Sequence, residues 1–165
     1  MKCLVFSDSH NNSYYIKKAI LLHKDAELVF FLGDGLSDID EVYYAFPCVK
    51  FLAVRGNCDM RMVALNSIIQ KTAEIELCGK KIIYTHGDLY GAKYGTAGLE
   101  RLALEKYADI VLFGHTHTPT EKYFSDAEKP FYLFNPGSIG DRDASYGIIT
   151  LSDGKEPLFS HGNFL

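Results

Sequence analysis

The sequence predicts an α/β fold in which two facing sheets carry helices on their outer sides. Three observations predict it. The first third alternates short apolar runs with segments of helical period, which is typical of parallel strands joined by helical crossovers. The last third consists of short β-rich runs separated by Gly, Pro, Asp and Ser, which indicate a second, more antiparallel sheet. The length favours a single domain over 1–165 with a sizeable core.

The first half of the chain is expected to follow a β-α-β-α-β order. Its apolar runs predict three buried strands, at 2–7, 27–32 and 49–54. Apolar residues at helical spacing predict two helices, at 14–24 and 38–46. Asn12 and Ser13 offer N-caps for the first of these helices.

The second half begins with a predicted hairpin, in which the strands 72–77 and 81–86 flank a turn at Gly79. A helix over 96–108 is expected to lead into the apolar run 109–114. The remaining strand candidates are four short runs, at 121–126, 131–136, 146–151 and 156–161.

Composition and charge exclude several classes of protein. The chain is 47% hydrophobic and 23% charged, which is typical of a folded globular protein. Its net charge of -4 argues against a dedicated nucleic-acid-binding surface, which needs a basic face. The four cysteines are widely spaced, so neither a zinc ribbon nor a disulfide framework is expected. No stretch reaches the ~18 apolar residues of a membrane span. Asp8 also follows the first apolar run too soon for a signal peptide. We therefore expect a cytoplasmic protein with no membrane partner.

Metal-competent side chains follow five of the predicted strands. The five motifs are Asp8-x-His10, Gly33-Asp34-Gly35, Gly56-Asn57-Cys58-Asp59, Thr85-His86-Gly87 and Gly114-His115-Thr116-His117. In open α/β sheets, ligands collect outside the carboxyl ends of the strands, so these loops should converge. Taken alone, Asp34 and Asn57 are more often turn residues, and His86 is more often a strand-end histidine than a ligand. Their conjunction predicts a metal site, because imidazole is the commonest metal ligand. His23 and His161 have no such partners, and we expect them to be structural or solvated.

The ordered set of motifs, followed by Asn135-Pro136-Gly137-Ser138, resembles the calcineurin-like metallophosphoesterase superfamily, and within it the small phosphodiesterases of the YfcE type. The resemblance runs from residue 8 to residue 138. It implies a four-layer α/β/β/α sandwich that carries two divalent metal ions. It also implies a set of ligands: Asp8, His10 and His117 for the first metal, Asn57, His86 and His115 for the second, and Asp34 as the bridge.

The resemblance implies that a metal-held hydroxide attacks the phosphorus of a phosphodiester, with Asp34, Asn57, His86 and His115 at the catalytic centre. A carboxylate can span two cations through its two oxygens, which suits Asp34. Seven side chains with one shared leave open positions for water and substrate. The mixed nitrogen and oxygen ligands suit manganese, the metal we expect, and also iron, nickel or zinc. The sequence contains neither a G-x-S-x-G elbow nor a phosphate loop that would supply a competing mechanism.

Two residues depart from the family pattern. Cys58 stands where many relatives have a histidine that protonates the leaving oxygen, and we expect the thiol to fill space rather than act as an acid. Asp88 stands where close relatives often have another histidine. It either orients a ligand from outside the coordination shell or caps its loop. Asn135 is expected to be a turn residue that holds its loop against the site. Lys93 and Arg142 are the cations to consider for substrate phosphate, with solvated surface charges as the alternative.

Two other functions stay open at this point. The metallophosphoesterase-like subunit of retromer keeps the fold as a protein-interaction scaffold with eroded ligand positions, whereas all seven positions here carry competent side chains. A regulator that only binds a nucleotide at the metals is the third hypothesis, and metal-dependent turnover would separate it from an enzyme. The expected partner is a small phosphodiester substrate, and a homo-oligomer is compatible with the sequence.

Overall fold

The computed structural model describes residues 1–59 and 69–164. The strands in this part of the chain are β1 (Lys2–Phe6), β2 (Leu28–Phe31), β3 (Lys50–Ala53), β4 (Thr72–Leu77), β5 (Lys80–Thr85), β6 (Ile110–Leu112), β7 (Thr120–Phe124), β8 (Phe131–Asn135), β9 (Ser145–Thr150) and β10 (Leu158–Asn163). The helices are α1 (Tyr14–Leu22), α2 (Leu36–Ala45) and α3 (Ala97–Lys106), with short 3-10 helices η2 (Asp88–Tyr90) and η3 (Ala92–Tyr94). Within the described ranges, no helix is long and apolar enough to cross a membrane.

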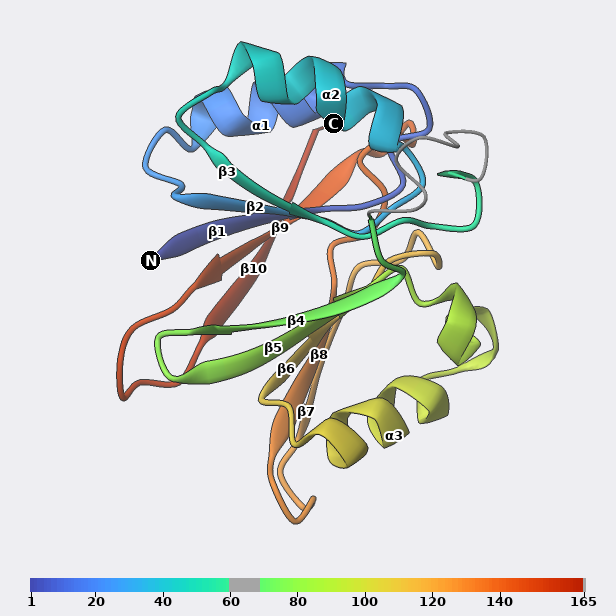
Figure 1. Ribbon diagram of the computed structural model, residues 1–165, viewed down its shortest axis with the longest axis vertical. Helices are drawn as coiled ribbons and strands as arrows, with labels where there is room; N and C mark the ends of the chain where they lie inside the picture. Colours follow the sequence, from blue (N-terminus) through green and yellow to red (C-terminus); the bar gives the residue numbers. More distant parts are fainter. Residues whose placement is uncertain (60–68, 165) are drawn as a thin grey trace.

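The strands form two mixed sheets, with the orders β10-β9-β1-β2-β3 and β4-β5-β6-β8-β7. Figure 1 shows α1 and α2 over the outer face of the first sheet and α3 beside the second. Parallel pairing joins β1 to β2 and β2 to β3 in one sheet, and β5 to β6 and β6 to β8 in the other. The predicted α/β sandwich of two facing mixed sheets with flanking helices is confirmed.

The core consists of three apolar clusters that separate these layers. Side chains alternate across β1, so Cys3 and Val5 lie between the two sheets, whereas Leu4 and Phe6 lie under α1 and α2. Leu99 of α3 belongs to the third cluster, on the outer face of the second sheet. Because both faces of the central strands are covered, these strands read in the sequence as continuous apolar runs.

The expected composition of the two sheets was wrong for the last two strands. β9 pairs antiparallel with β1, and β10 pairs with β9, so both extend the first sheet rather than the second. Along β9, Tyr146 belongs to the cluster under α1 and α2, and Ile149 belongs to the cluster between the sheets. Gly147 faces Phe134 of the other sheet, and a Cβ atom there would overlap the Phe134 ring. Both faces of β9 are therefore covered by apolar side chains, as in a strand from the interior of a sheet.

The helix ends differ from the prediction for identifiable reasons. Ser13 precedes α1 but makes no capping hydrogen bond, and its hydroxyl donates to Glu41 of α2. α1 ends at Leu22, two residues earlier than expected. The predicted hairpin turn is confirmed, since Cys78 and Gly79 both have positive φ, at 49° and 68°, as a two-residue type I′ turn requires.

Candidate metal centre

The loops that follow β1, β2, β3, β5 and β6 bring side chains together, as the sequence predicts. Within the described residues, donor atoms lie within 4.8 Å of one another in three groups: Asp8, His10 and His117; His10, Asp34 and Cys58; and Asp34, His86 and His115. Asp34 and His10 each belong to two of these groups, so each of them links neighbouring groups of donors.

The backbone at these positions is strained. Five of the converging residues have φ in the left-handed region: Asp8 at 56°, His10 at 46°, Asp34 at 58°, His115 at 68° and His117 at 59°. This conformation costs roughly 1–2 kcal/mol for a residue with a side chain. Such strain concentrates at functional sites, where the surrounding structure imposes it. Here it turns each side chain sharply from its strand end into the cluster.

Asp8 is fully buried, and its two carboxylate oxygens differ. Oδ2 accepts hydrogen bonds from the Ser7 hydroxyl and from the backbone N–H of His115. Oδ1 accepts no hydrogen bond from any described residue. It faces the Nε2 atoms of three histidines: His117 at 3.3 Å, His10 at 3.9 Å and His86 at 3.9 Å. A buried carboxylate oxygen that accepts no hydrogen bond is costly, and a divalent cation would satisfy it.

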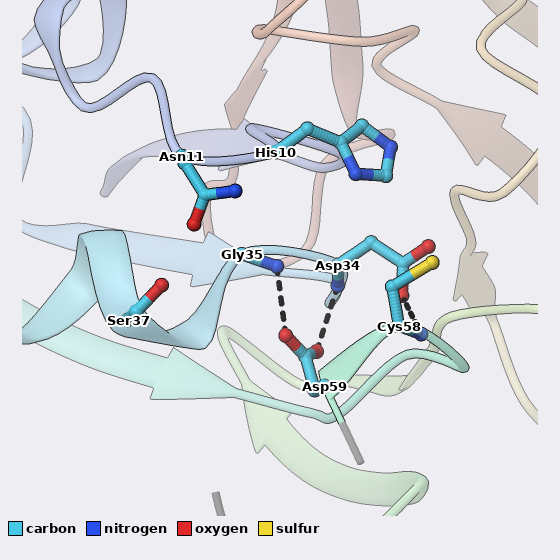
Figure 2. Close-up of a pocket in the computed structure, with 7 residues that line it drawn as sticks. All are labelled: His10, Asn11, Asp34, Gly35, Ser37, Cys58 and Asp59. Carbon is cyan, nitrogen blue, oxygen red and sulfur yellow. Dashed lines mark hydrogen bonds between the residues drawn. The ribbon is translucent and has the colours of Figure 1, made fainter. Parts of the chain in front are cut away.

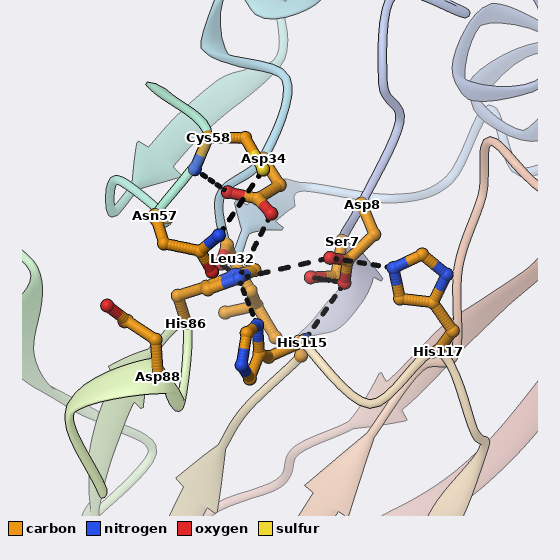
Figure 3. A network of polar contacts seen from close by, with 12 residues as sticks. Ser7, Asp8, Leu32, Asp34, Asn57, Cys58, His86, Asp88, His115 and His117 are labelled. Atoms are coloured by element: carbon orange, nitrogen blue, oxygen red, sulfur yellow. Dashed lines mark hydrogen bonds and ion pairs between the residues drawn. The ribbon is translucent and has the colours of Figure 1, made fainter. Parts of the chain in front are cut away.

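Hydrogen bonds to the Nδ1 atoms orient the rings of two of the histidines. Nδ1 of His86 lies 2.8 Å from the carbonyl oxygen of Leu32, so Nδ1 carries the proton and Nε2 faces Asp34 at 3.4 Å. Nδ1 of His117 lies 2.9 Å from Asp141, which leaves its Nε2 facing Asp8. Metal-binding histidines are held by this kind of partner on the second ring nitrogen. Figure 3 shows the resulting network of histidines around the two carboxylates.

Asp59 fixes the loop that carries Asp34. Its carboxylate accepts four backbone N–H hydrogen bonds, from Asp34, Gly35, Leu36 and Gly56. The α2 helix begins at Leu36, earlier than predicted, because Asp59 supplies partners for the N–H groups at its start. Asp34 Oδ1 in turn accepts the N–H of Cys58 at 2.7 Å. Asp59 belongs to the motif Gly56-Asn57-Cys58-Asp59, but nothing in the sequence around it indicates this role.

The charges of the cluster stabilise one another. Burial raises the pKa of Asp8, but the close approach of His117 and the charge of His86 outweigh it and bring the pKa below its ordinary value. The contact with Asp8 is the largest influence on His117 and raises its pKa to about 9. Burial opposes ionisation of Asp34 too, yet the contact with His86 lowers its pKa below the ordinary value. Two ionised carboxylates thus attract positive charge to the centre.

Glycine is required where the loops touch. A Cβ atom on Gly114 would overlap the side chain of Ser7 and would lie 2.9 Å from Asp8 Oδ2. A Cβ atom on Gly56 would overlap the carboxylate of Asp34. Both glycines therefore allow a ligand-bearing loop to approach its neighbour closely.

The remaining predicted ligand, Asn57, lies at the edge of the cluster in Figure 3. Its amide donates to the sulfur of Cys58 at 3.3 Å. Burial and the neighbouring Asp34 raise the pKa of the Cys58 thiol to about 11, so the thiol is protonated near neutral pH. Cys58, His10 and Asp34 line a cavity of about 430 Å³ beside the cluster (Figure 2).

Asp88 forms an ion pair with Lys71 at 2.8 Å through Oδ2, and its Oδ1 atom has no hydrogen-bond partner within the described residues. Lys71 was not identified from the sequence. It directly precedes β4, whose first residue Thr72 pairs with Thr85, the residue before His86. The ion pair therefore lies close in sequence to a candidate ligand.

The two predicted substrate cations lie outside the cluster. Lys93 is exposed, and its charge contributes to lowering the pKa of His115, after burial and His86. Arg142 is exposed and lines a separate cavity of about 480 Å³ together with His117 and Asp141.

The other polar residues have structural roles. Asn135 is confirmed as a turn residue: it accepts the N–H of Gly137, and its amide donates to the carbonyl oxygen of Gly114. His23 contacts the Tyr146 hydroxyl at 2.9 Å, and His161 contacts the carbonyl oxygen of Asn135 at 2.8 Å. Both histidines are structural, as predicted.

Comparison with known proteins identifies the family to which this chain belongs. The model of the calcineurin-like phosphoesterase superfamily domain matches residues 1–154. The chain is 32% identical over 107 residues to phosphodiesterase YfcE of Escherichia coli, an alignment that covers 61% of this chain and 52% of that protein. A longer alignment, with the probable metallophosphoesterase YsnB of Bacillus subtilis, has 29% identity over 157 residues and covers 93% of this chain and 86% of that protein.

Two solved structures share the fold. One is described as a novel archaeal phosphodiesterase, with a TM-score of 0.76, 25% sequence identity and coverage of 99% of this chain and 100% of that one. The other is wild-type Vps29 of Entamoeba histolytica complexed with Zn²⁺, with a TM-score of 0.75, 18% identity and coverage of 99% of both chains. At that identity, Vps29 shows a shared fold alone.

Proposed function

We propose a metal-dependent phosphodiesterase function for this chain, which belongs to the calcineurin-like phosphoesterase superfamily because the family model matches residues 1–154. The family implies divalent metal ions and the hydrolysis of phosphoric esters. The choice of diesters is supported by the E. coli and archaeal relatives, both named as phosphodiesterases.

The observation that carries the proposal is the buried Oδ1 atom of Asp8. No described residue gives it a hydrogen bond, and three imidazole nitrogens surround it. The donor set therefore fits a cation at this point. We assign Asp8, His10 and His117 to a first metal, Asn57, His86 and His115 to a second, and Asp34 to both. The same assignment gives Asp34, Asn57, His86 and His115 places at the catalytic centre.

When bound, two divalent ions would acidify a water molecule for attack on phosphorus and would neutralise charge on the phosphoryl oxygens. The chain itself holds the donors in place. Leu32 and Asp141 fix the orientation of His86 and His117. Hydrogen bonds from Ser7 and His115 hold the Asp8 carboxylate, and the N–H of Cys58 holds that of Asp34. The cavity of about 430 Å³ over His10 and Asp34 is large enough for a small substrate.

No protein nucleophile is needed. The Cys58 thiol lines the cavity, and its raised pKa keeps it protonated and unreactive near neutral pH. We propose manganese as the working metal, with iron, nickel and zinc as the alternatives that nitrogen and oxygen ligands also suit. We also propose that Lys93 and Arg142 contact the substrate phosphate as cations, a weaker proposal than that of the metal ligands.

The scaffold hypothesis predicts a chain that keeps the fold without the ligand set. The fold likeness to Vps29 is compatible with such a role. An enzyme is favoured because the side chains at all seven assigned positions can bind a metal ion. Six of them belong to the groups of neighbouring donors.

The test is metal-dependent turnover. Protein stripped with a chelator should not hydrolyse an aryl phosphodiester such as bis(4-nitrophenyl) phosphate, and Mn²⁺ should restore the reaction. Parallel titrations with Fe²⁺, Ni²⁺ and Zn²⁺ would rank the metals. Full activity in excess chelator after prolonged incubation would falsify the proposal. Tight metal binding without turnover of any diester would favour the scaffold or the nucleotide-binding regulator.

A further inference from the structure

We infer that His10, Asp34 and Cys58 form an alternative coordination set that takes one thiophilic divalent cation, of the class of Cd²⁺ and Zn²⁺. The inference rests on the proposed metal centre, since it shares His10 and Asp34 with the assigned ligands. Cys58 is the member that the seven-ligand assignment leaves unused.

The geometry provides three different donors around one point. An imidazole nitrogen, a carboxylate oxygen and a thiol sulfur lie within 4.8 Å of one another. An ion with bonds of about 2.0–2.3 Å can hold two donors apart by up to nearly twice that length. His10 and Cys58 are both exposed, so small rotations of these side chains bring the donors to bonding distance.

The cavity beside the cluster gives a cation access to this set. His10, Asp34 and Cys58 all line it, and Figure 2 shows the Cys58 sulfur beside the Asp34 carboxylate on the wall of the cavity. An incoming ion can therefore contact all three donors without unfolding a loop. The open side leaves room for a water molecule as the fourth ligand of a tetrahedral ion.

The sulfur distinguishes this set from the assigned ligands. Thiolate is a soft ligand that selects soft or borderline ions, whereas carboxylate, amide and imidazole groups serve Mn²⁺ as well. When the cation binds, a metal–sulfur bond forms and the thiol proton leaves to solvent. Asn57 donates to the sulfur at 3.3 Å, and this hydrogen bond would stabilise the bound thiolate.

Sharing two ligands has a consequence. A cation held by His10, Asp34 and Cys58 uses the donors that the first metal and the bridge require, so the two arrangements exclude each other. A thiophilic cation should therefore displace Mn²⁺ rather than add to it. Cys58 would have no bond to Mn²⁺ and a direct bond to Cd²⁺.

The experiment is a Cd²⁺ titration of chelator-stripped protein, followed by ultraviolet thiolate-to-metal charge-transfer absorption. We expect a band that saturates at one equivalent of Cd²⁺ per chain. Cys58→Ser should abolish the band, and Cys48→Ser, which changes an exposed thiol elsewhere, should retain it. His10→Gln should weaken Cd²⁺ binding by about 10-fold or more, which is at least the loss caused by removing an outer partner of a ligand.

A second measurement follows Mn²⁺ released from preloaded protein by its electron paramagnetic resonance signal. Cd²⁺ should release Mn²⁺ from the wild-type chain at lower concentration than from Cys58→Ser. A charge-transfer band that survives in Cys58→Ser, or that vanishes in Cys48→Ser, would overturn the inference. Failure of diester hydrolysis with an intact Cys58-dependent band would overturn the proposed function and leave the coordination set standing.

Discussion

The Nδ1 atom of His117 lies 2.9 Å from Asp141 Oδ2, and the opposite ring nitrogen faces Asp8 at 3.3 Å. A carboxylate outside the cluster thus decides which nitrogen of His117 is available to a metal. Such partners orient the ring and increase the basicity of the ligating nitrogen. Asp141 is one of three exposed residues in the loop before β9, so its position, rather than burial, gives it this role.

Asp141→Asn should weaken Mn²⁺ binding by about 10–100-fold, because an amide neither holds the ring nor increases its basicity as a carboxylate does. Equilibrium titration of the stripped variant measures the loss. Asp143→Asn is the matched control, since Asp143 is exposed and lines the same outer cavity without contacting His117 through a hydrogen bond among the described residues. Equal Mn²⁺ affinity in the wild-type chain and in Asp141→Asn would show that His117 does not ligate as assigned.

Asp34→Asn should be the most damaging single change in the ligand set. It removes a negative charge that both metals share, so metal content should fall to one ion or fewer per chain. Turnover should fall by orders of magnitude. Elemental analysis after gel filtration counts the metals, with the exposed Asp40→Asn on α2 as the control for a lost charge. Two tightly held ions in Asp34→Asn would place the bridge at another residue.

Gly114→Ala tests the close packing of the loops. The added Cβ atom would overlap the Ser7 side chain and would lie 2.9 Å from Asp8 Oδ2. Overpacking of this kind typically costs about 1–3 kcal/mol of unfolding free energy. Chemical denaturation of the metal-free variant should show this loss, and Mn²⁺ affinity should fall with it because Asp8 must move. An unchanged denaturation midpoint would mean that the loop relaxes freely.

The convergence of the ligands could be predicted from the sequence because it follows from a general property of parallel strands. Asp8, Asp34 and His86 each come just after an apolar run, and parallel strands bring their carboxyl ends to the same edge. Glycine beside most of these residues marks the sharp turns. The alternation of strands and helices gives the layers for the same reason, since each parallel pair needs a covered crossover.

The supporting residues could not be predicted in the same way. Asp59, Asp141 and Asp38 look like ordinary loop or helix-start carboxylates, and only the folded chain brings them to their partners. Asp38, for example, accepts hydrogen bonds from Ser9 and from the N–H of Asn11, 29 and 27 positions away. The placement of β9 in the first sheet was missed because an alternating pattern fixes which faces are buried and not which strand is the neighbour.

Cys58 determines how the leaving group should affect the rate of the Mn²⁺-loaded protein. Its pKa of about 11 and its place beside Asp34 make the thiol a poor proton donor, so we expect it to fill space in this form. Nitrophenyl diesters should then react far faster than alkyl diesters, whose leaving oxygens need a proton. Cys58→Ala and Cys58→Ser should change little with either class of substrate.

Cys58→His would place a competent acid at the same point, because imidazole titrates near neutral pH. General acid catalysis is typically worth roughly 10²–10⁴-fold, so even an imperfectly placed imidazole should raise turnover of alkyl diesters detectably while nitrophenyl diesters gain little. Rates for a series of diesters with graded leaving-group acidity provide the measurement, with metal content determined for each variant. A large loss in Cys58→Ala that is confined to alkyl diesters, at unchanged metal content, would instead identify the thiol as the acid.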